Sequence, residues 1–174
     1  VNALAAAAAA RAAGADFKAI ATGLSELEPV AGRLQALTGL NGSQLIDDSY
    51  NANPASLAAA METLTAEAGP VWLVLGDMAE LGDSAERLHT EAGEHARALG
   101  ISRLFATGEL SAHAVEAFGA DGRWFADQSA LIEATATALE PGVRVLVKGS
   151  RSAAMDRVVA ALCEPGAAEG RACC

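Results

Sequence analysis

The chain has 174 residues, enough for one domain with a well-formed core and an attached segment but too few for two full domains. Its formal net charge is −10, from 12 basic and 22 acidic residues, so it lacks the broad basic surface that nucleic-acid binders use, and no nucleic acid is expected as a partner. It contains no run of about 18 strongly apolar residues, and no contact with a membrane is expected.

The first 31 residues are predicted to form a helical segment. Residues 1–13 are rich in alanine, which has the highest helix propensity, and Gly14 ends this run. Asp16 is the expected N-cap of a second helix that continues to residue 27, before Pro29. We expect a domain boundary between residues 1–31 and the part that follows.

From residue 33 onward, short apolar runs alternate with amphipathic stretches, a pattern typical of βα units around a parallel sheet. Strands are predicted at residues 45–46, 71–75, 103–106 and 143–147, with a weaker candidate at 124–125. Helices are predicted at residues 54–68, 84–99, 111–118, 128–140 and 152–162. These elements predict a three-layer α/β domain at residues 32–164, followed by a tail at residues 165–174 that is expected to be disordered.

The densest group of polar side chains is the sequence DDSYNANP at residues 47–54. A short apolar strand precedes it, Asn53 is a favourable N-cap, and Pro54 is a favourable first residue of the next helix. The group is therefore expected at the carboxyl end of a strand, where ligands bind in open α/β sheets and a helix N-terminus offers N–H groups to anions. The alternative is a capped turn whose polar groups bind only the backbone.

A second candidate loop is GDMAELGDS at residues 76–84, where glycines bracket Asp77 and Glu80 before a helix. Glycine permits close backbone approach to a ligand, and the carboxylates suit an ammonium group or the support of a metal. The alternative is a solvated turn.

A third candidate loop is KGSRS at residues 148–152, where Lys148 and Arg151 flank a glycine at the head of a helix. A guanidinium offers a planar fork to a carboxylate or phosphate, and the helix N-terminus adds N–H donors. This arrangement predicts an anion site. The chain contains neither a G-x-x-x-x-G-K-[ST] phosphate loop nor a G-x-G-x-x-G dinucleotide fingerprint.

The histidines and tryptophans carry weaker signals. His89 belongs to the helix that follows the acidic loop, where it is placed to orient a ligand or a loop acid. His95 and His113 are expected at the surface. Trp72 and Trp124 fall on predicted strands and are expected in the core.

The three cysteines, Cys163, Cys173 and Cys174, are an odd number near the C-terminal end, and the first residues lack the basic region and cleavage site of a signal peptide. Both features favour a reducing, cytoplasmic location. No His or second cysteine pair lies at metal-ligand spacing from Cys173 and Cys174, so a reactive tail is expected there and no metal site.

Five motifs, in this order along the chain, resemble the Mur ligase family. They are NALAA at residues 2–6, GRL at 32–34, DDSYNANP at 47–54, LGDMAELG at 75–82 and VKGSRSAAM at 147–155. The resemblance covers nearly the whole chain up to residue 163. The asparagine-rich motif and KGSRS are similar to those of the family members that add a D-Ala-D-Ala dipeptide, in contrast to siblings that add a single amino acid.

The resemblance implies ATP-dependent amide formation that joins D-Ala-D-Ala to UDP-MurNAc-tripeptide in the cytoplasmic synthesis of the peptidoglycan precursor. Family members also have an N-terminal domain for the UDP-sugar and a central ATPase domain with a phosphate loop, magnesium-binding acids and a carbamylated lysine, and this chain contains none of those motifs. The resemblance therefore implies a C-terminal fragment. Residues 1–31 resemble the helical end of the central domain, and residues 32–164 a Rossmann-like domain that closes over the active site.

Such a fragment is expected to be a monomer that is inactive alone and has no catalytic residue of its own. The expected cofactors are ATP and Mg²⁺, and the expected partners are D-Ala-D-Ala, UDP-MurNAc-tripeptide and its own N-terminal and central domains. The magnesium ligands would lie in the missing central domain. The residues expected at the ATP are Arg33, Asp47, Asp48, Tyr50, Asn51 and Asn53. Those expected at D-Ala-D-Ala are Asp77, Met78, Lys148, Ser150 and Arg151. Arg151 or Lys148 would bind the terminal carboxylate of the dipeptide, and Asp77 would lie near its ammonium group.

The implied reaction begins when ATP phosphorylates the tripeptide carboxylate. The amine of D-Ala-D-Ala then attacks the acyl phosphate, and domain closure excludes water from this intermediate. Two alternatives stay open from the residues alone. One is a stand-alone Rossmann-like domain that binds a nucleotide or small metabolite, and the other is an oxidoreductase, against which the missing dinucleotide fingerprint counts.

Overall fold

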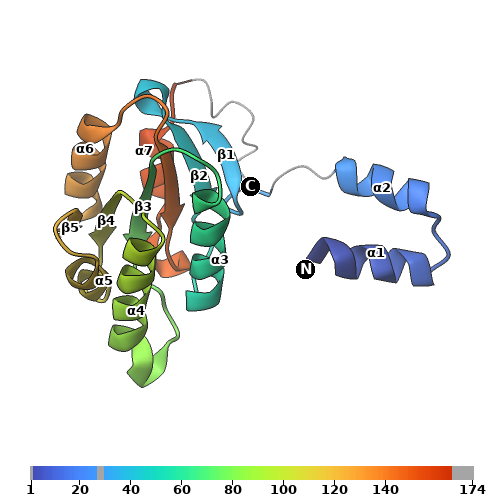
Figure 1. The fold of residues 1–174 in the computed structure, drawn as a ribbon, viewed down its shortest axis with the longest axis horizontal. Coiled ribbons are helices and arrows are strands. Elements are labelled where there is room, and N and C mark those ends of the chain that lie inside the picture. The colour runs from blue at the N-terminus through green and yellow to red at the C-terminus, as the bar shows by residue number, and fades with distance from the viewer. Residues whose placement is uncertain (1, 27–29, 166–174) are drawn as a thin grey trace. The chain divides into compact units, whose positions relative to one another are not determined.

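The computed structural model of the chain describes residues 2–26 and 30–165. The chain folds as two compact units, one up to residue 30 and one from residue 31 onward. The first is a helical unit and the second an α/β unit (Figure 1). Residues 27–29 and 166–174 lie outside the described part, and with them the predicted end of the second helix and the predicted tail with Cys173 and Cys174.

The helical unit consists of α1, Asn2–Ala12, and α2, Phe17–Ser25, as the alanine-rich sequence predicts. The carboxylate of Asp16 caps α2 by accepting a hydrogen bond from the Ala19 backbone N–H at 2.7 Å. None of the side chains described between residues 3 and 26 is buried. The described part of the helical unit therefore has no core of its own.

The α/β unit contains a six-stranded sheet in the order β1-β2-β6-β3-β4-β5. The strands are β1, Gln35–Thr38, β2, Gln44–Asp48, β3, Val71–Gly76, β4, Arg103–Thr107, β5, Gly122–Phe125, and β6, Arg144–Lys148. Every neighbouring pair is parallel except β1 with β2. All five predicted strands are confirmed.

The hydrophobic pattern does not predict strand β1. This strand is only four residues long, its side chains alternate between half-buried and exposed, and it lies at the edge of the sheet. Its pairing is antiparallel to β2, with Gln35 opposite Asp47 and Thr38 opposite Gln44. A short edge strand needs little apolar content, which explains why the pattern does not reveal it.

Helices cover both faces of the sheet (Figure 1) and confirm the predicted three-layer α/β architecture. They are α3, Pro54–Thr65, α4, Ala85–Ala98, α5, Ser111–Phe118, α6, Gln128–Ala138, and α7, Asp156–Leu162. Alternate residues of β3 point to opposite sides: Leu73 and Leu75 pack with α3, α4 and α5, whereas Trp72 and Val74 pack with α6 and α7. The sheet is therefore buried on both faces.

One core prediction is wrong. Trp72 is buried, but Trp124 is 46% exposed, because β5 is the other edge strand and the indole N–H of Trp124 donates to the Gly108 carbonyl at 2.8 Å. An indole that is half exposed with a satisfied N–H is stable at a surface. The strand assignment is right, and the expected burial of its side chain is not.

The register of the central strands brings their carboxyl ends to one level. Asp48 at the end of β2 lies opposite Lys148 at the end of β6, which in turn lies opposite Leu75 of β3, and Gly76 lies opposite Thr107 of β4. We call this side of the sheet, formed by the ends of β2, β6, β3 and β4, the carboxyl edge. All three polar loops predicted from the sequence begin here.

Candidate functional site

A cavity of about 640 Å³ opens at the carboxyl edge, and we call it the loop cavity. The three predicted loops all contribute to its wall. Its polar lining consists of Asn51 and Asn53 from the first loop, Glu80 from the second, and Ser150, Arg151 and Ser152 from the third. Segments that are about 100 residues apart in the sequence are thus brought to one place by the parallel pairing of β2 with β6.

The first loop is built around two acids with different environments. Asp47 is 1% exposed, and its carboxylate accepts hydrogen bonds from the Ser49 hydroxyl at 2.6 Å and the Ser49 backbone N–H at 3.2 Å. The carboxylate of Asp48 accepts from the Lys148 ammonium at 2.5 Å and from the Leu34 backbone N–H at 3.2 Å. Asp47 therefore shapes the turn, whereas Asp48 links β2 to the end of β6 and to the backbone that precedes β1.

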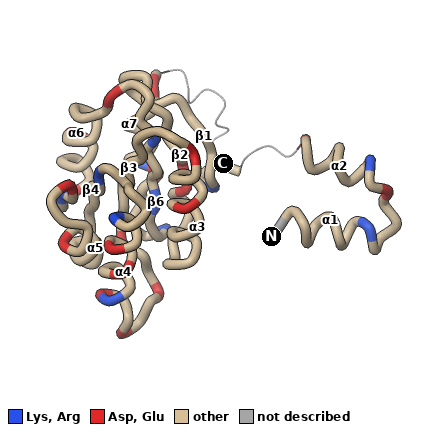
Figure 2. The backbone as a smooth tube through the Cα atoms, in the orientation of Figure 1, with Lys and Arg blue, Asp and Glu red and all other residues tan. Residues whose placement is uncertain are grey.

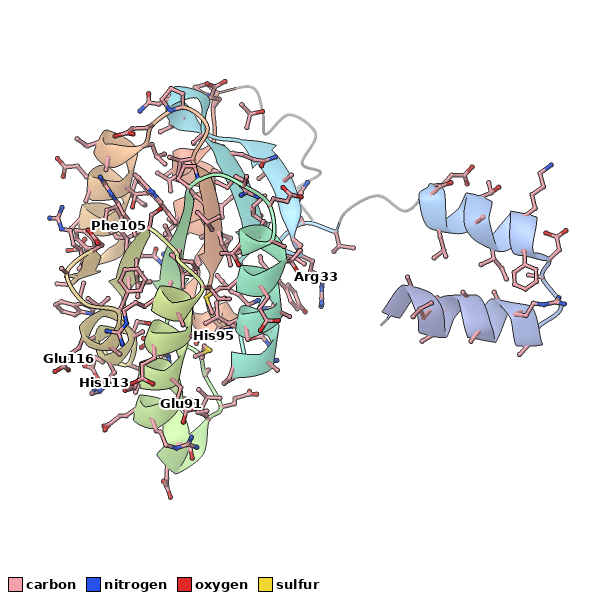
Figure 3. All side chains as sticks on the ribbon, viewed as in Figure 1. Arg33, Glu91, His95, Phe105, His113 and Glu116 are labelled. Atoms are coloured by element: carbon pink, nitrogen blue, oxygen red, sulfur yellow. The ribbon has the colours of Figure 1, made fainter. Side chains whose placement is uncertain are left out.

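An exposed tyrosine flanked by two arginines follows these acids in the first loop. Tyr50 is 46% exposed, and the guanidinium carbons of Arg33 and Arg151 lie 4.4 Å and 5.9 Å from its ring centroid. Arg33 projects at the surface of the α/β unit (Figure 3). Gly32 allows the backbone before Arg33 to lie close to Tyr50, because an added Cβ at Gly32 would meet the Tyr50 backbone nitrogen at 3.1 Å. Two cations and a π face are thus gathered at one solvent-accessible place.

Asn53 and Pro54 begin α3 as predicted. The Asn53 side chain accepts from the Ser56 backbone N–H at 2.9 Å, and the Ser56 hydroxyl accepts from the Asn53 backbone N–H at 3.2 Å. This reciprocal pair is a capping box. Asn53 also lines the loop cavity.

The second loop uses the side chain of Asp77 to begin another helix. Its carboxylate accepts from the Ser111 backbone N–H at 2.8 Å and the Ser111 hydroxyl at 2.7 Å, at the start of α5. Its backbone carbonyl accepts from the Ser150 N–H at 2.8 Å. Asp77 therefore joins the second loop to α5 and to the third loop.

A buried histidine holds the rest of the second loop. The Nε2 atom of His89 accepts from the Met78 backbone N–H at 3.0 Å, so Nδ1 carries the proton and donates to the Ala85 carbonyl at 2.7 Å. Both His89 and Met78 are fully buried. The structure shows His89 bonded to the backbone of this loop, whereas the sequence suggested that it could orient a ligand or a loop acid. Glu80 follows with a positive φ of 61° and lines the loop cavity.

A second cavity of about 370 Å³ adjoins the same loops. It is lined by Asp77 and Ser152 from the predicted loops and by Thr107, Gly108, Asp127 and Gln128. Sequence analysis does not single out Asp127 or Gln128. The available sequence signal is the N-cap position of Asp127, whose carboxylate accepts from the Ala130 N–H at 2.9 Å.

The predicted site residues fall into two groups. The accessible group consists of Arg33, Tyr50, Asn51, Asn53 and Arg151, which are exposed, and Asp77, which is half-buried. Asp47, Met78, Lys148 and Ser150 are each at most 2% exposed, and Asp48 is largely enclosed. Burial of this second group favours roles in shaping the loops over direct contact with a ligand.

Figure 2 shows basic and acidic positions interspersed along the backbone of the α/β unit. Among residues 2–26 and 30–165, no group of three or more His, Cys, Asp or Glu side chains is placed to hold a metal ion. No helix in the described part of the chain is both long and apolar enough to cross a membrane.

An open, mostly parallel sheet with three polar loops around a cavity at its carboxyl edge defines an α/β domain of the class in which ligands bind at that edge. Residues 32–151 match the family described as Mur ligase, glutamate ligase domain. The chain belongs to this family, as its motifs indicated.

The chain is 46% identical to the UDP-N-acetylmuramoyl-tripeptide–D-alanyl-D-alanine ligase of Escherichia coli, over 95% of the chain and 37% of that protein. A crystal structure of MurF from Acinetobacter baumannii superposes with a TM-score of 0.80 at 33% identity, over 91% of the chain and 36% of that structure. MurF ligase from Thermotoga maritima in complex with ADP gives a TM-score of 0.73 at 26% identity, over 88% and 35%. The chain thus spans little more than a third of the length of these relatives.

Proposed function

We propose that this chain is the C-terminal part of an ATP-dependent ligase that joins D-Ala-D-Ala to UDP-MurNAc-tripeptide. In the proposed reaction the tripeptide carboxylate is phosphorylated by ATP, and the dipeptide amine displaces phosphate to form the new amide bond. The observation that carries the proposal is the loop cavity, whose wall combines the asparagine-rich loop with the KGSRS loop. The 46% identity to the Escherichia coli ligase supports the choice of substrates.

The nucleotide half of the proposed site is the surface formed by Arg33, Tyr50, Asn51 and Asn53. The exposed Arg33 guanidinium suits phosphate or ribose oxygens, and the two carboxamides offer donors and acceptors for nucleotide polar groups. Asp48 lies behind this surface, where its carboxylate accepts from Lys148 and from the Leu34 N–H and so supports the backbone beside Arg33. The complex of the Thermotoga maritima relative with ADP supports a nucleotide as ligand.

The dipeptide half of the proposed site is formed by Arg151 of the third loop and the acids of the second loop. Arg151 is exposed there and suits the terminal carboxylate of D-Ala-D-Ala, while Glu80 and Asp77 are the acids of the second loop and suit its ammonium group. Ser150 and Met78 support these loops from beneath.

We further propose that residues 1–31 are the helical end of a central ATPase domain and that residues 32–164 are the closing C-terminal domain. Leu4 and Phe17 are 77% and 76% exposed, which suits helices that pack against protein preceding Val1. In this proposal the magnesium ligands and the UDP-sugar site lie in those preceding domains, and the ligase acts as a cytoplasmic monomer.

A chimeric enzyme tests the proposal. The region of the Escherichia coli ligase that corresponds to residues 1–163 would be replaced by this chain, and product formation would be followed by mass spectrometry. We expect amide product that depends on ATP, UDP-MurNAc-tripeptide and D-Ala-D-Ala, and no turnover from the 174-residue chain alone. A folded chimera without turnover, or product from the chain alone, would contradict the proposal.

The binding-module alternative predicts a different result. If the α/β unit works as a stand-alone nucleotide-binding domain, calorimetry with an ATP analogue would show saturable binding to the chain without any other domain. We expect no such binding, because in the proposed function this chain supplies only part of the nucleotide site, with Arg33, Tyr50, Asn51 and Asn53.

A further inference from the structure

Lys148 is the largest side chain of the described residues that is fully enclosed, with an exposure of 1%. It ends the central strand β6, between β2 and β3, and its stem is surrounded by the sheet and its loops. A buried ammonium is stable only with close anionic or carbonyl partners. Its partners therefore show what this lysine does.

The ammonium group of Lys148 has two partners, both in the first loop. It donates to the Asp48 carboxylate at 2.5 Å and to the Asn51 backbone carbonyl at 3.0 Å. The same carboxylate accepts from the Leu34 backbone N–H at 3.2 Å. Through Asp48, Lys148 thus holds the backbone next to Arg33. Through the Asn51 carbonyl, it holds the backbone next to Tyr50.

The positions of these segments depend on unusual backbone conformations. Gly32 and Leu34 both have a positive φ, of 75° and 49°, and the Gly32 carbonyl accepts from the Tyr50 N–H at 3.1 Å. Leu34 is not glycine, so its conformation requires support from its surroundings. The bond from its N–H to the Asp48 carboxylate supplies that support, and Lys148 fixes the carboxylate.

We propose that Lys148 is a positioning residue for the nucleotide half of the site and not a ligand of the dipeptide carboxylate. The residue that suits the dipeptide carboxylate is the exposed Arg151, three residues later, because the Lys148 ammonium is enclosed and already bonded to the Asp48 carboxylate. This inference rests on the proposed function for the identity of the two ligands, whereas the positioning of the loop stands on the contacts alone.

The first test uses the chain alone and does not require ligase activity. Amide hydrogen exchange would be measured by NMR in the chain and in its Lys148→Met variant. We expect the exchange protection of the Leu34 amide to fall by at least about tenfold, while strand amides such as Val74 keep their protection. The NMR chemical shift of the Ala52 amide should also change, because this N–H shares a peptide group with the Asn51 carbonyl. Arg97→Met, which removes an exposed cation from α4, is the control and should change neither. Unchanged Leu34 and Ala52 amides in Lys148→Met would overturn the proposal.

The second test separates the two halves of the site in the chimeric ligase. Lys148→Met should raise the KM for ATP by about tenfold or more and leave the KM for D-Ala-D-Ala within about twofold, whereas Arg151→Met should give the reverse pattern. A rise confined to the KM for D-Ala-D-Ala in Lys148→Met would overturn the proposal. If the unsubstituted chimera is inactive, the proposed function fails, and the exchange experiment still decides the positioning role.

Loss of Lys148 alone leaves Asp48 enclosed without its cation, which can prevent folding. The double variant Lys148→Met with Asp48→Asn removes both charges and keeps a carbonyl acceptor for the Leu34 N–H. We expect it to fold, to retain partial Leu34 protection, and still to shift the Ala52 amide, because the bond to the Asn51 carbonyl is lost. A folded double variant with an unshifted Ala52 amide would overturn the proposal.

Discussion

Gly108 lies where the Asp77 carboxylate needs space. A Cβ added at residue 108 would meet the carboxylate atoms of Asp77 at 2.3 to 2.6 Å, and the φ of Gly108 is +105°. The same carboxylate begins α5 through Ser111. The absence of a side chain at Gly108 thus leaves room for Asp77, which joins the second loop to α5 and to the third loop.

We expect Gly108→Ala to lower the free energy of unfolding by about 2–4 kcal/mol, because it adds a steric clash to the strain of a positive φ. Denaturant unfolding followed by circular dichroism measures the change. Gly119→Ala is a matched control, since Gly119 has a φ of +100° but nothing within 4 Å of an added Cβ. The difference between the two variants isolates the clash with Asp77, and equal losses would contradict this interpretation.

At the scale of elements, α4 supports the second loop through His89. The imidazole accepts from the Met78 N–H and donates to the Ala85 carbonyl, and both His89 and Met78 are enclosed. A helix side chain therefore replaces the strand partner that the Met78 N–H would have inside a sheet. The histidine is a structural link between α4 and the second loop.

His89→Leu should cost about 1–3 kcal/mol of unfolding free energy, because it leaves the buried Met78 N–H without an acceptor. His113→Leu on α5 is the comparison, since His113 is only half-buried. Thermal unfolding of both variants gives the measurement, and hydrogen exchange at Met78 should rise only in His89→Leu. A loss no larger than that of His113→Leu would refute this role for the histidine.

The contact between α4 and α5 depends on Gly93. An added Cβ there would lie 2.0 Å from the Ala114 carbonyl oxygen, which belongs to the backbone of α5. Alanine normally stabilises a helix interior by roughly 1 kcal/mol relative to glycine. The packing of two backbones opposes this gain.

We therefore expect Gly93→Ala to destabilise the α/β unit by about 1–3 kcal/mol in spite of its higher helix propensity. Glu94→Ala, at the next and exposed position of α4, raises propensity without a clash and should change stability by at most about 0.5 kcal/mol. Urea unfolding of the two variants makes the comparison. A gain in stability for Gly93→Ala would show that α4 and α5 can move apart without a cost in unfolding free energy.

At the scale of the molecule, the two units have different sources of stability. The α/β unit buries apolar side chains on both faces of its sheet. The helical unit buries none of its described side chains, and its helices of 11 and 9 residues are too short to be stable in water by propensity alone. We therefore expect its helicity to depend on contacts beyond those within the unit.

Removal of residues 1–30 should therefore leave the unfolding midpoint of the α/β unit within about 2 °C of that of the full chain. Differential scanning calorimetry of the two proteins checks this. A peptide of residues 1–30 should show no cooperative transition by circular dichroism. A drop of several degrees on truncation would mean that the helical unit stabilises the α/β core.

Much of this molecule can be predicted from local signals. The alternation of apolar runs indicates the five strands from β2 to β6, Asp16 and Asn53 indicate two helix starts, and the motifs at residues 47–54 and 147–155 indicate the family. The hydrophobic pattern of an edge strand is weaker, because one side of the strand has no neighbouring strand and its side chains are more exposed. For that reason the pattern reveals neither β1 nor the exposure of Trp124 on β5.

The sequence by itself determined the fold class, the family and the three loops that carry the candidate site, because each of these is encoded in short-range patterns. Only the tertiary structure decided which polar groups in those loops are accessible. Asp48 and Lys148 are 100 residues apart, and the register of β2 with β6 places them opposite each other, so that each satisfies the charge of the other. Arg33 and Arg151 instead extend beside Tyr50 at the surface. Long-range strand pairing thus separates the charges that support the site from those that can meet a ligand.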